Sequence, residues 1–268
     1  MGRSKAGSQV LPYVLGVALQ LLGCVSGLEA QFGPMVNPAQ VPQARSQEEL
    51  DTYLANITET DPQKTVKKVE SFTAQYPKSE LAGIAYEYQM HAYVQMNDFD
   101  GVLRAGEKAL LAHPGNLNTL LPLASALASR AAGRPDRDQL LERAEGYAHQ
   151  ALKGMEETMI PRQISLERWE IQKRELQAEA HEVFGEVAMQ RGQVQRAVSE
   201  FEMAVRADPN PQGIEFLRLG AAYELAGDAQ GAERTLHRAA ELGPAPVRQR
   251  ALTNLKELTE KRSTTKRP

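Results

Sequence analysis

The chain has 268 residues, an apolar fraction of 42% and a formal net charge of −3 at pH 7. Its length allows one or two ordinary domains or one solenoid, and the absence of a long basic run argues against nucleic-acid binding. Its single cysteine, Cys24, excludes an intrachain disulfide and a metal cluster held by several thiolates.

The first thirty residues have the layout of a secretory signal peptide. Arg3 and Lys5 give a positive start, and Val10–Val25 then runs for sixteen residues without a charge. This run is short for a membrane span, which needs about 20 residues. We predict a signal peptide over residues 1–27, cleaved after residue 27 or 30, with an uncleaved anchor as the alternative.

A third possibility for this region is lipidation. The string Leu21-Leu22-Gly23-Cys24 resembles a bacterial lipoprotein box, in which the cysteine becomes the lipidated first residue. The alternative is that Cys24 is only an apolar filler of the signal core. We expect an exported protein, periplasmic or associated with the outer membrane, with secretion as the alternative. Membrane contact is expected only through this lipid or an uncleaved signal.

Residues 28–45 contain three prolines and no helical periodicity, which predicts a flexible linker. Ser46, with Glu49 three residues later, has the pattern of a helix start. We place a helical repeat domain at residues 46–262 and a disordered basic tail at 263–268.

Three weaker helical hairpins are expected first in this domain. In the second of them, Gly106 stands where the later hairpins have a bulky residue. The third spans Leu117–Lys153, and an interruption with one proline follows at Gly154–Arg162. Ile164–Arg191 then reads as one helix of about 42 Å, in which Trp169 is expected to be a packing residue.

Between Glu179 and Pro244 one pattern is written twice, with every member displaced by 35 residues. The first copy comprises His181, Phe184, Gly185, Ala188, Gly192, Ala197, Phe201, Ala204 and Pro209; the second comprises Phe216, Leu219, Gly220, Tyr223, Gly227, Ala232, Leu236, Ala239 and Pro244. A fixed period of this length indicates a repeat architecture, in which stacked units bury a face that none buries alone.

Each class of residue in the pattern has a physical role. Gly192 and Gly227 permit a tight turn between two helices. Gly185 and Gly220 lie inside a helix, where glycine costs about 1 kcal/mol relative to alanine, so we expect a neighbouring helix to approach closely there. The prolines end the second helix of each copy. After Pro244, Val247–Lys261 is expected to form a capping helix.

These residues resemble the tetratricopeptide repeat (TPR): a bulky residue before Gly, an aromatic residue, Gly at the turn, then Ala, Phe or Leu, Ala and Pro. The first copy departs from the family at His181 and at Ala188, where an aromatic residue is usual. The resemblance implies an all-α, right-handed superhelical solenoid. We expect about five antiparallel hairpins and a C-terminal capping helix.

No phosphate-binding loop, zinc-protease motif or nucleophile elbow is present, and we predict neither an enzyme nor a cofactor or metal site. Glu87 and His91 share a helix face, but two ligands are too few for a metal. The resemblance instead implies a concave groove that holds a peptide or helix of another protein. Its expected lining is Glu87, His91, Gln95, Glu179, Glu182, Glu186, Gln190, Arg218 and Glu224.

The recurrent glutamates favour a basic or mixed partner, although they could equally be solvated helix faces. The lysine and asparagine set with which some relatives clamp a C-terminal carboxylate is absent from these positions.

Three functions remain open at this point. The first is a non-catalytic interaction scaffold of the cell envelope. The second rests on Gln75–Ala82, which resembles repeats of outer-membrane-assembly lipoproteins and of periplasmic division-coordinating proteins. The third is an enzyme or carrier that takes a small molecule in the groove, which would require a deep pocket with converging polar groups.

Overall fold

The structure, a computed structural model, describes residues 42–157 and 165–265. The predicted signal peptide, Cys24 and most of the predicted linker lie outside these ranges. Within them the chain is helical, without strands. The helices are α2 (Gln47–Ile57), α3 (Pro62–Gln75), α4 (Ala82–Gln95), α5 (Phe99–Ala112), α6 (Leu117–Arg130), α7 (Arg137–Glu157), α8 (Leu166–Gln190), α9 (Val194–Ala207), α10 (Gly213–Ala226), α11 (Ala229–Leu242) and α12 (Ala245–Thr265).

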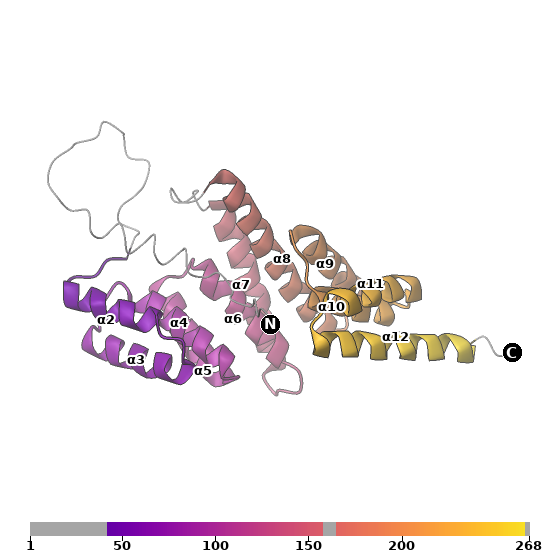
Figure 1. Cartoon of the computed structure of the whole chain (residues 1–268), viewed down its shortest axis with the longest axis horizontal. Coiled ribbons are helices and arrows are strands. Elements are labelled where there is room, and N and C mark those ends of the chain that lie inside the picture. Colours follow the sequence, from indigo (N-terminus) through magenta and orange to yellow (C-terminus); the bar gives the residue numbers. More distant parts are fainter. Residues whose placement is uncertain (1–41, 158–164, 266–268) are drawn as a thin grey trace, which may run out of the picture.

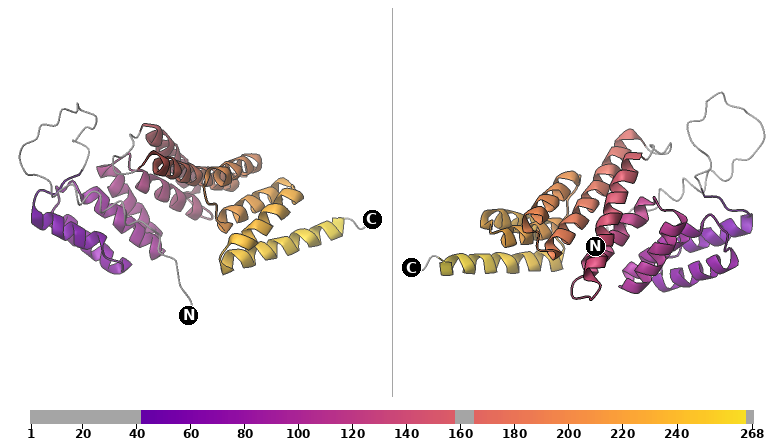
Figure 2. Two further views of the ribbon diagram at one scale, coloured as in Figure 1. Left: turned by 45° about the horizontal axis from the view of Figure 1, so that its top comes forward. Right: turned by 180° about the vertical axis from the view of Figure 1, so that it is seen from behind.

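The helices form five antiparallel hairpins, α2/α3, α4/α5, α6/α7, α8/α9 and α10/α11, followed by α12. Figure 1 shows these units side by side in chain order, and Figure 2 shows that they follow an arc. First helices of neighbouring hairpins also touch, since α6 packs against α8 and α2 against α4. The predicted all-α hairpin solenoid with a C-terminal capping helix is confirmed.

In each of the last two hairpins a glycine of the first helix lies close against a large side chain of the second. A Cβ added to Gly185 would lie 2.5 Å from the ring of Phe201, and one added to Gly220 would lie 2.8 Å from Leu236. Both pairs are 16 residues apart, and Phe201 and Leu236 are almost fully buried. The predicted close approach at the two glycines is therefore present.

The same contact occurs in α4/α5 with its two members exchanged. Met90 occupies the first-helix position that glycine holds in the later hairpins, and Gly106 occupies the second-helix position. The two are again 16 residues apart, and a Cβ on Gly106 would lie 3.0 Å from the sulfur of Met90. The departure noted at Gly106 is thus matched by a bulkier residue on the facing helix.

The other repeat positions also take their expected places. The five alanines of the repeat pattern are fully buried: Ala188, Ala197, Ala204, Ala232 and Ala239. Helices α9 and α11 end two residues before Pro209 and Pro244. The turn glycines Gly192 and Gly227 have φ values of 71° and 78°, which glycine adopts at little cost.

Tyr223 packs beside another glycine. A Cβ on Gly231 would lie 3.0 Å from the Tyr223 ring, and the tyrosine hydroxyl donates to Glu202. Tyr93 and Gly101 repeat this arrangement in α4/α5, where a Cβ added to Gly101 would lie 2.3 Å from the Tyr93 ring. The first copy, which departs from the family at Ala188, has no such aromatic pair.

Two expectations about helix bounds were wrong. Gly154 was expected to begin an interruption, but α7 continues through it to Glu157. One interior glycine costs only about 1 kcal/mol, and the burial of Ala151 and Met155 offsets that cost. Helix α12 begins at Ala245 rather than Val247 and extends to Thr265, beyond the expected end at Lys261.

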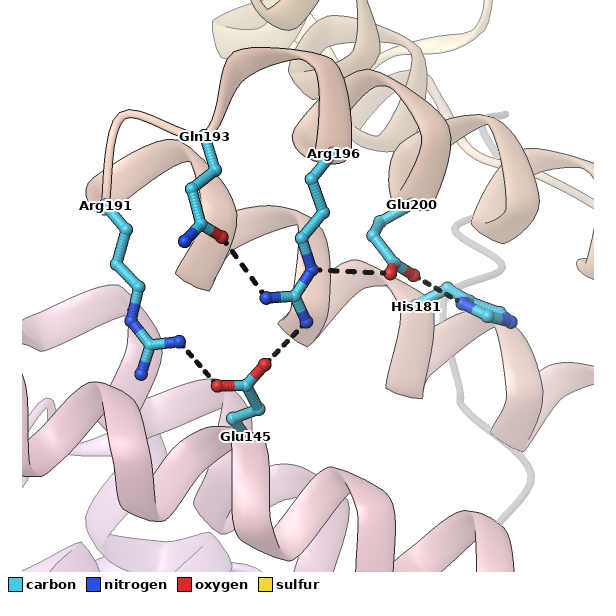
Figure 3. A network of polar contacts seen from close by, with 6 residues as sticks. All are labelled: Glu145, His181, Arg191, Gln193, Arg196 and Glu200. Carbon is cyan, nitrogen blue, oxygen red and sulfur yellow. Dashed lines mark hydrogen bonds and ion pairs between the residues drawn. The ribbon is translucent and has the colours of Figure 1, made fainter.

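A polar network joins the third and fourth hairpins (Figure 3). Glu145 of α7 accepts hydrogen bonds at 2.5 Å from both Arg191 and Arg196. Arg196 also lies 3.8 Å from Glu200, whose other oxygen is 2.8 Å from Nδ1 of His181. Burial alone would raise the pKa of Glu145, but the two guanidinium groups hold it below its ordinary value. His181, where the first copy departs from the family pattern, is thus part of the polar network between these two hairpins.

We predict that Gly185→Ala lowers the free energy of unfolding by roughly 1–3 kcal/mol, because the methyl group meets Phe201 in a packed core. The matched control is Gly146→Ala in α7, where a Cβ meets no atom within 4 Å. That change should stabilise the chain by about 0.5–1 kcal/mol. Urea denaturation measures both, and equal effects of the two substitutions would contradict the close approach.

Candidate functional site

A cavity of about 350 Å³ opens between the first helices of the second, third and fourth hairpins. Its lining comes from α4, the following turn, α5, α6 and one residue of α8. The lining residues are His91, Tyr93, Val94, Asn97, Phe99, Val102, Pro122, Ser125, Ala126, Ser129, Arg130 and Glu179. The cavity thus lies on the face that the first helices present, where the TPR resemblance places its groove.

Local sequence explains how α6 forms one wall of the cavity. Asn116 caps the helix by accepting from the backbone N–H of Asn118 at 3.0 Å. Pro122, inside the helix, removes one backbone donor and keeps its ring on the cavity side. Ser125, Ala126 and Ser129 continue the same face at helical spacing, while Leu123 and Leu127 are buried on the other side. The wall is therefore made of small side chains.

Asn97, in the turn between α4 and α5, forms the polar end of the cavity. It has a φ of 57°, the same left-handed conformation that Gly192 and Gly227 adopt in the later turns. Its side-chain oxygen accepts a hydrogen bond from the guanidinium of Arg130. The guanidinium of Arg130, the one arginine in the lining, is therefore oriented by Asn97 and keeps its positive charge.

Two predicted groove residues, His91 and Glu179, meet across this cavity although they lie 88 residues apart. Burial lowers the pKa of His91, which favours the neutral imidazole. Burial also raises the pKa of Glu179 from 4.5 to about 7. Within the described residues, no hydrogen bond or ion pair reaches the Glu179 carboxylate. It is thus a half-buried acid that takes up or releases a proton near neutral pH.

Other predicted groove residues are held by partners inside the protein. Burial raises the pKa of Glu87, and the side-chain amide of Asn116 opposes this shift by donating to Glu87 at 2.6 Å. Glu182 forms an ion pair with Arg218 of the next hairpin. Burial still raises the pKa of Glu182, because its second oxygen is buried without a hydrogen-bond partner among the described residues.

The remaining predicted residues lie away from the cavity. Gln190 donates to Glu186 at 3.1 Å and to the carbonyl of Ala128, and so links α8 to α6. Gln95 is exposed. Glu224 faces α12, and burial raises its pKa. The candidate lipidation residue, Cys24, lies outside the described residues.

Sequence reasoning missed the contribution of α6 and one acidic position. The spacing of Pro122, Ser125, Ala126 and Ser129, a face of small residues opposite the leucines, could have indicated an exposed inner wall. Glu215 of α10 was also missed: burial raises its pKa to about 7, with Asp208 and Glu182 adding to the rise. Nothing in the local sequence distinguishes Glu215 from an ordinary first-turn glutamate.

The comparisons with solved structures bear on the fold. The MamA RS-1 ArsTM double mutant aligns with 74% of this chain and 96% of its own, with a TM-score of 0.53 and 11% identity. The chain has a TPR-like helical solenoid fold. A thermophilic TPR protein of Thermus thermophilus covers 77% of this chain and 98% of its own, at a TM-score of 0.49 and 19% identity. No family model matches the chain, and no curated protein does. Identity this low establishes the fold alone.

The described part of the TPR-like chain offers no metal site. Residues 42–157 and 165–265 contain no group of three or more His, Cys, Asp or Glu side chains that could hold a metal ion. In the same ranges no helix has the length and apolar character needed to cross a bilayer.

We predict that Glu179→Gln stabilises the chain at pH 8 by roughly 1–3 kcal/mol and changes it little at pH 4.5. The folded-state pKa is raised, so ionisation of Glu179 opposes folding once the pH exceeds the unfolded value of about 4.5. That cost grows until the pH passes about 7, and glutamine removes it.

Urea denaturation at the two pH values measures this difference. Glu175→Gln, an exposed residue one turn earlier on α8, is the matched control and should be neutral at both. A gain for Glu179→Gln that does not depend on pH would contradict the burial of the carboxylate.

Proposed function

We propose that this TPR-like protein is a non-catalytic interaction scaffold that binds a peptide or helix of another protein. The binding surface is the inner face, which we define as the side of α4, α6, α8 and α10 that carries the cavity. The observation that supports this most is the position of the cavity, because it spans the first helices of three successive hairpins. A single hairpin could not supply such a surface.

The charges of the inner face favour a partner segment that is basic or mixed in charge. Glu87, Glu179 and Glu182 are all carboxylates whose pKa is raised by burial. A cation brought into contact with them would favour their ionised forms and recover part of the free energy that desolvation costs. An acidic segment would meet repulsion on the same face.

The proposal can be tested by site-specific photocrosslinking in cells that produce the protein. A photoreactive amino acid at Ser125, on the cavity wall of α6, should yield one or a few discrete crosslinked products. The matched control is Ser199 of α9, an exposed serine on a second helix. Products that are equal at the two positions, or absent from both, would contradict binding at the inner face.

We further propose that the protein is exported and acts in the cell envelope, with residues 1–27 as the export signal. The support is the charge and hydropathy pattern of that segment, which lies outside the described residues. Two finer roles remain candidates: a lipid-anchored component of outer-membrane assembly, and a periplasmic division-coordinating protein. The likeness of Gln75–Ala82 to repeats of both groups motivates them.

Mass spectrometry of the mature N-terminus tests the export proposal. A lipid-modified Cys24 would favour the lipid-anchored role, whereas a free terminus at Leu28 or Gln31 would favour a periplasmic or secreted protein. An intact Met1 on protein recovered from the soluble cytoplasmic fraction would contradict export.

A further inference from the structure

We propose that the cavity between α4, α6 and α8 is the anchoring subsite of the inner face. It would take a lysine or arginine of the partner segment together with a neighbouring apolar side chain. This inference rests on the proposed scaffold function and specifies the partner chemistry of one place on that surface.

The cation would be bound by Glu179. Its carboxylate lines the cavity, is half-buried and has no hydrogen bond or ion pair to another described residue. None of the other titratable or charged groups of the lining forms an ion pair with it: burial favours neutral His91, and the Arg130 guanidinium, which keeps its charge, donates to Asn97 and not to Glu179. A buried carboxylate without a counter-ion is the acceptor that a partner cation would satisfy.

The serines of α6 add acceptors for the same cation. The Ser129 hydroxyl donates to the carbonyl of Ala126 at 3.2 Å, so its oxygen lone pairs remain available. Ser125 is exposed on the same wall. An ammonium group has three donors and a guanidinium has five, so both can use these oxygens besides the carboxylate.

The apolar part of the cavity would take the neighbouring side chain. Val94 of α4 is 48% exposed and lines the cavity together with Pro122 and Ala126 of α6. The volume of about 350 Å³ lies at the lower end of the range for ligand pockets, which is roughly 300–1,000 Å³. It therefore suits one or two side chains and is too small for a whole helix.

The groups on either side of the cavity favour a segment of chain over an isolated small molecule. Glu87 lies one helical turn before His91 on α4, and Glu182 and Glu186 lie one and two turns beyond Glu179 on α8. The acidic character therefore continues past both ends of the cavity. Glu182 already has Arg218 as its counter-ion, whereas Glu87 and Glu186 have only the neutral donors Asn116 and Gln190. A basic segment longer than one residue can therefore approach Glu87 or Glu186 as well as Glu179.

The test uses the full chain and a library of fluorescent nonapeptides with blocked termini. The peptides have randomised flanks and a fixed central pair: Leu-Lys, Leu-Arg, Leu-Gln, Leu-Glu or Ala-Lys. Fluorescence anisotropy should show that Leu-Lys and Leu-Arg pools bind about tenfold or more tightly than Leu-Gln, and that Leu-Glu binds most weakly. The Leu-Lys pool should also bind more tightly than Ala-Lys.

Two variants separate the parts of the subsite. Glu179→Gln should reduce the preference for Leu-Lys over Leu-Gln to within about twofold, and the exposed control Glu175→Gln should leave it unchanged. Ala126→Leu, which fills the apolar part, should remove the preference for Leu-Lys over Ala-Lys. Circular dichroism must show unchanged helix content for each variant. If peptides bind but Glu179→Gln leaves the preference intact, the inference fails alone; if no pool binds, the proposed scaffold function fails with it.

Discussion

One packing constraint recurs in three hairpins, α4/α5, α8/α9 and α10/α11: a residue with no side chain faces a large one across the two helices. Gly185 faces Phe201, Gly220 faces Leu236, and Met90 faces Gly106, each pair 16 residues apart. Because the interior of a protein is packed to near-crystalline density, either two large or two small residues at this crossing would push the helices apart or leave a void. The constraint fixes the distance between the two helices in these three hairpins and so favours their stacking on the neighbouring hairpins.

The functional surface follows from that stacking. Regularly spaced hairpins bring α4, α6 and α8 together, although their cavity-lining residues span positions 91–179. The same packing partly buries acidic side chains on these helices, and burial without a cationic partner is what raises the pKa of Glu179. On the proposed function, a basic partner segment would bind these partly buried carboxylates and favour their ionised forms. No catalytic group is needed for this role.

The periodic positions could be predicted from sequence because each reports a local backbone or size requirement. A left-handed turn favours glycine, and so does the close approach of another helix, which is why the roles of Gly192 and Gly185 could be predicted from their positions in the pattern.

Contacts between hairpins could not be predicted in this way. Glu182 was correctly placed on a first helix, but its pairing with Arg218 depends on a neighbouring unit 36 residues away. The interruption predicted at Gly154 was wrong for a related reason, because the burial of neighbouring residues outweighed the low helix propensity of glycine. The groove residues expected from sequence remain predictions; the structure brings His91 and Glu179 to the cavity and pairs Glu182 with Arg218 within the protein.

The most direct measurement of the packing constraint is a double-mutant cycle at its exchanged pair. Met90→Gly, Gly106→Leu and the double variant convert α4/α5 to the arrangement seen at Gly220 and Leu236. Each single change should be destabilising, the first by leaving a void and the second by overpacking against Met90 and Leu123. We expect the double variant to be more stable than the sum of the single effects by roughly 1–3 kcal/mol. Additive losses in urea denaturation would contradict the account, because the two residues would then not be filling a shared space.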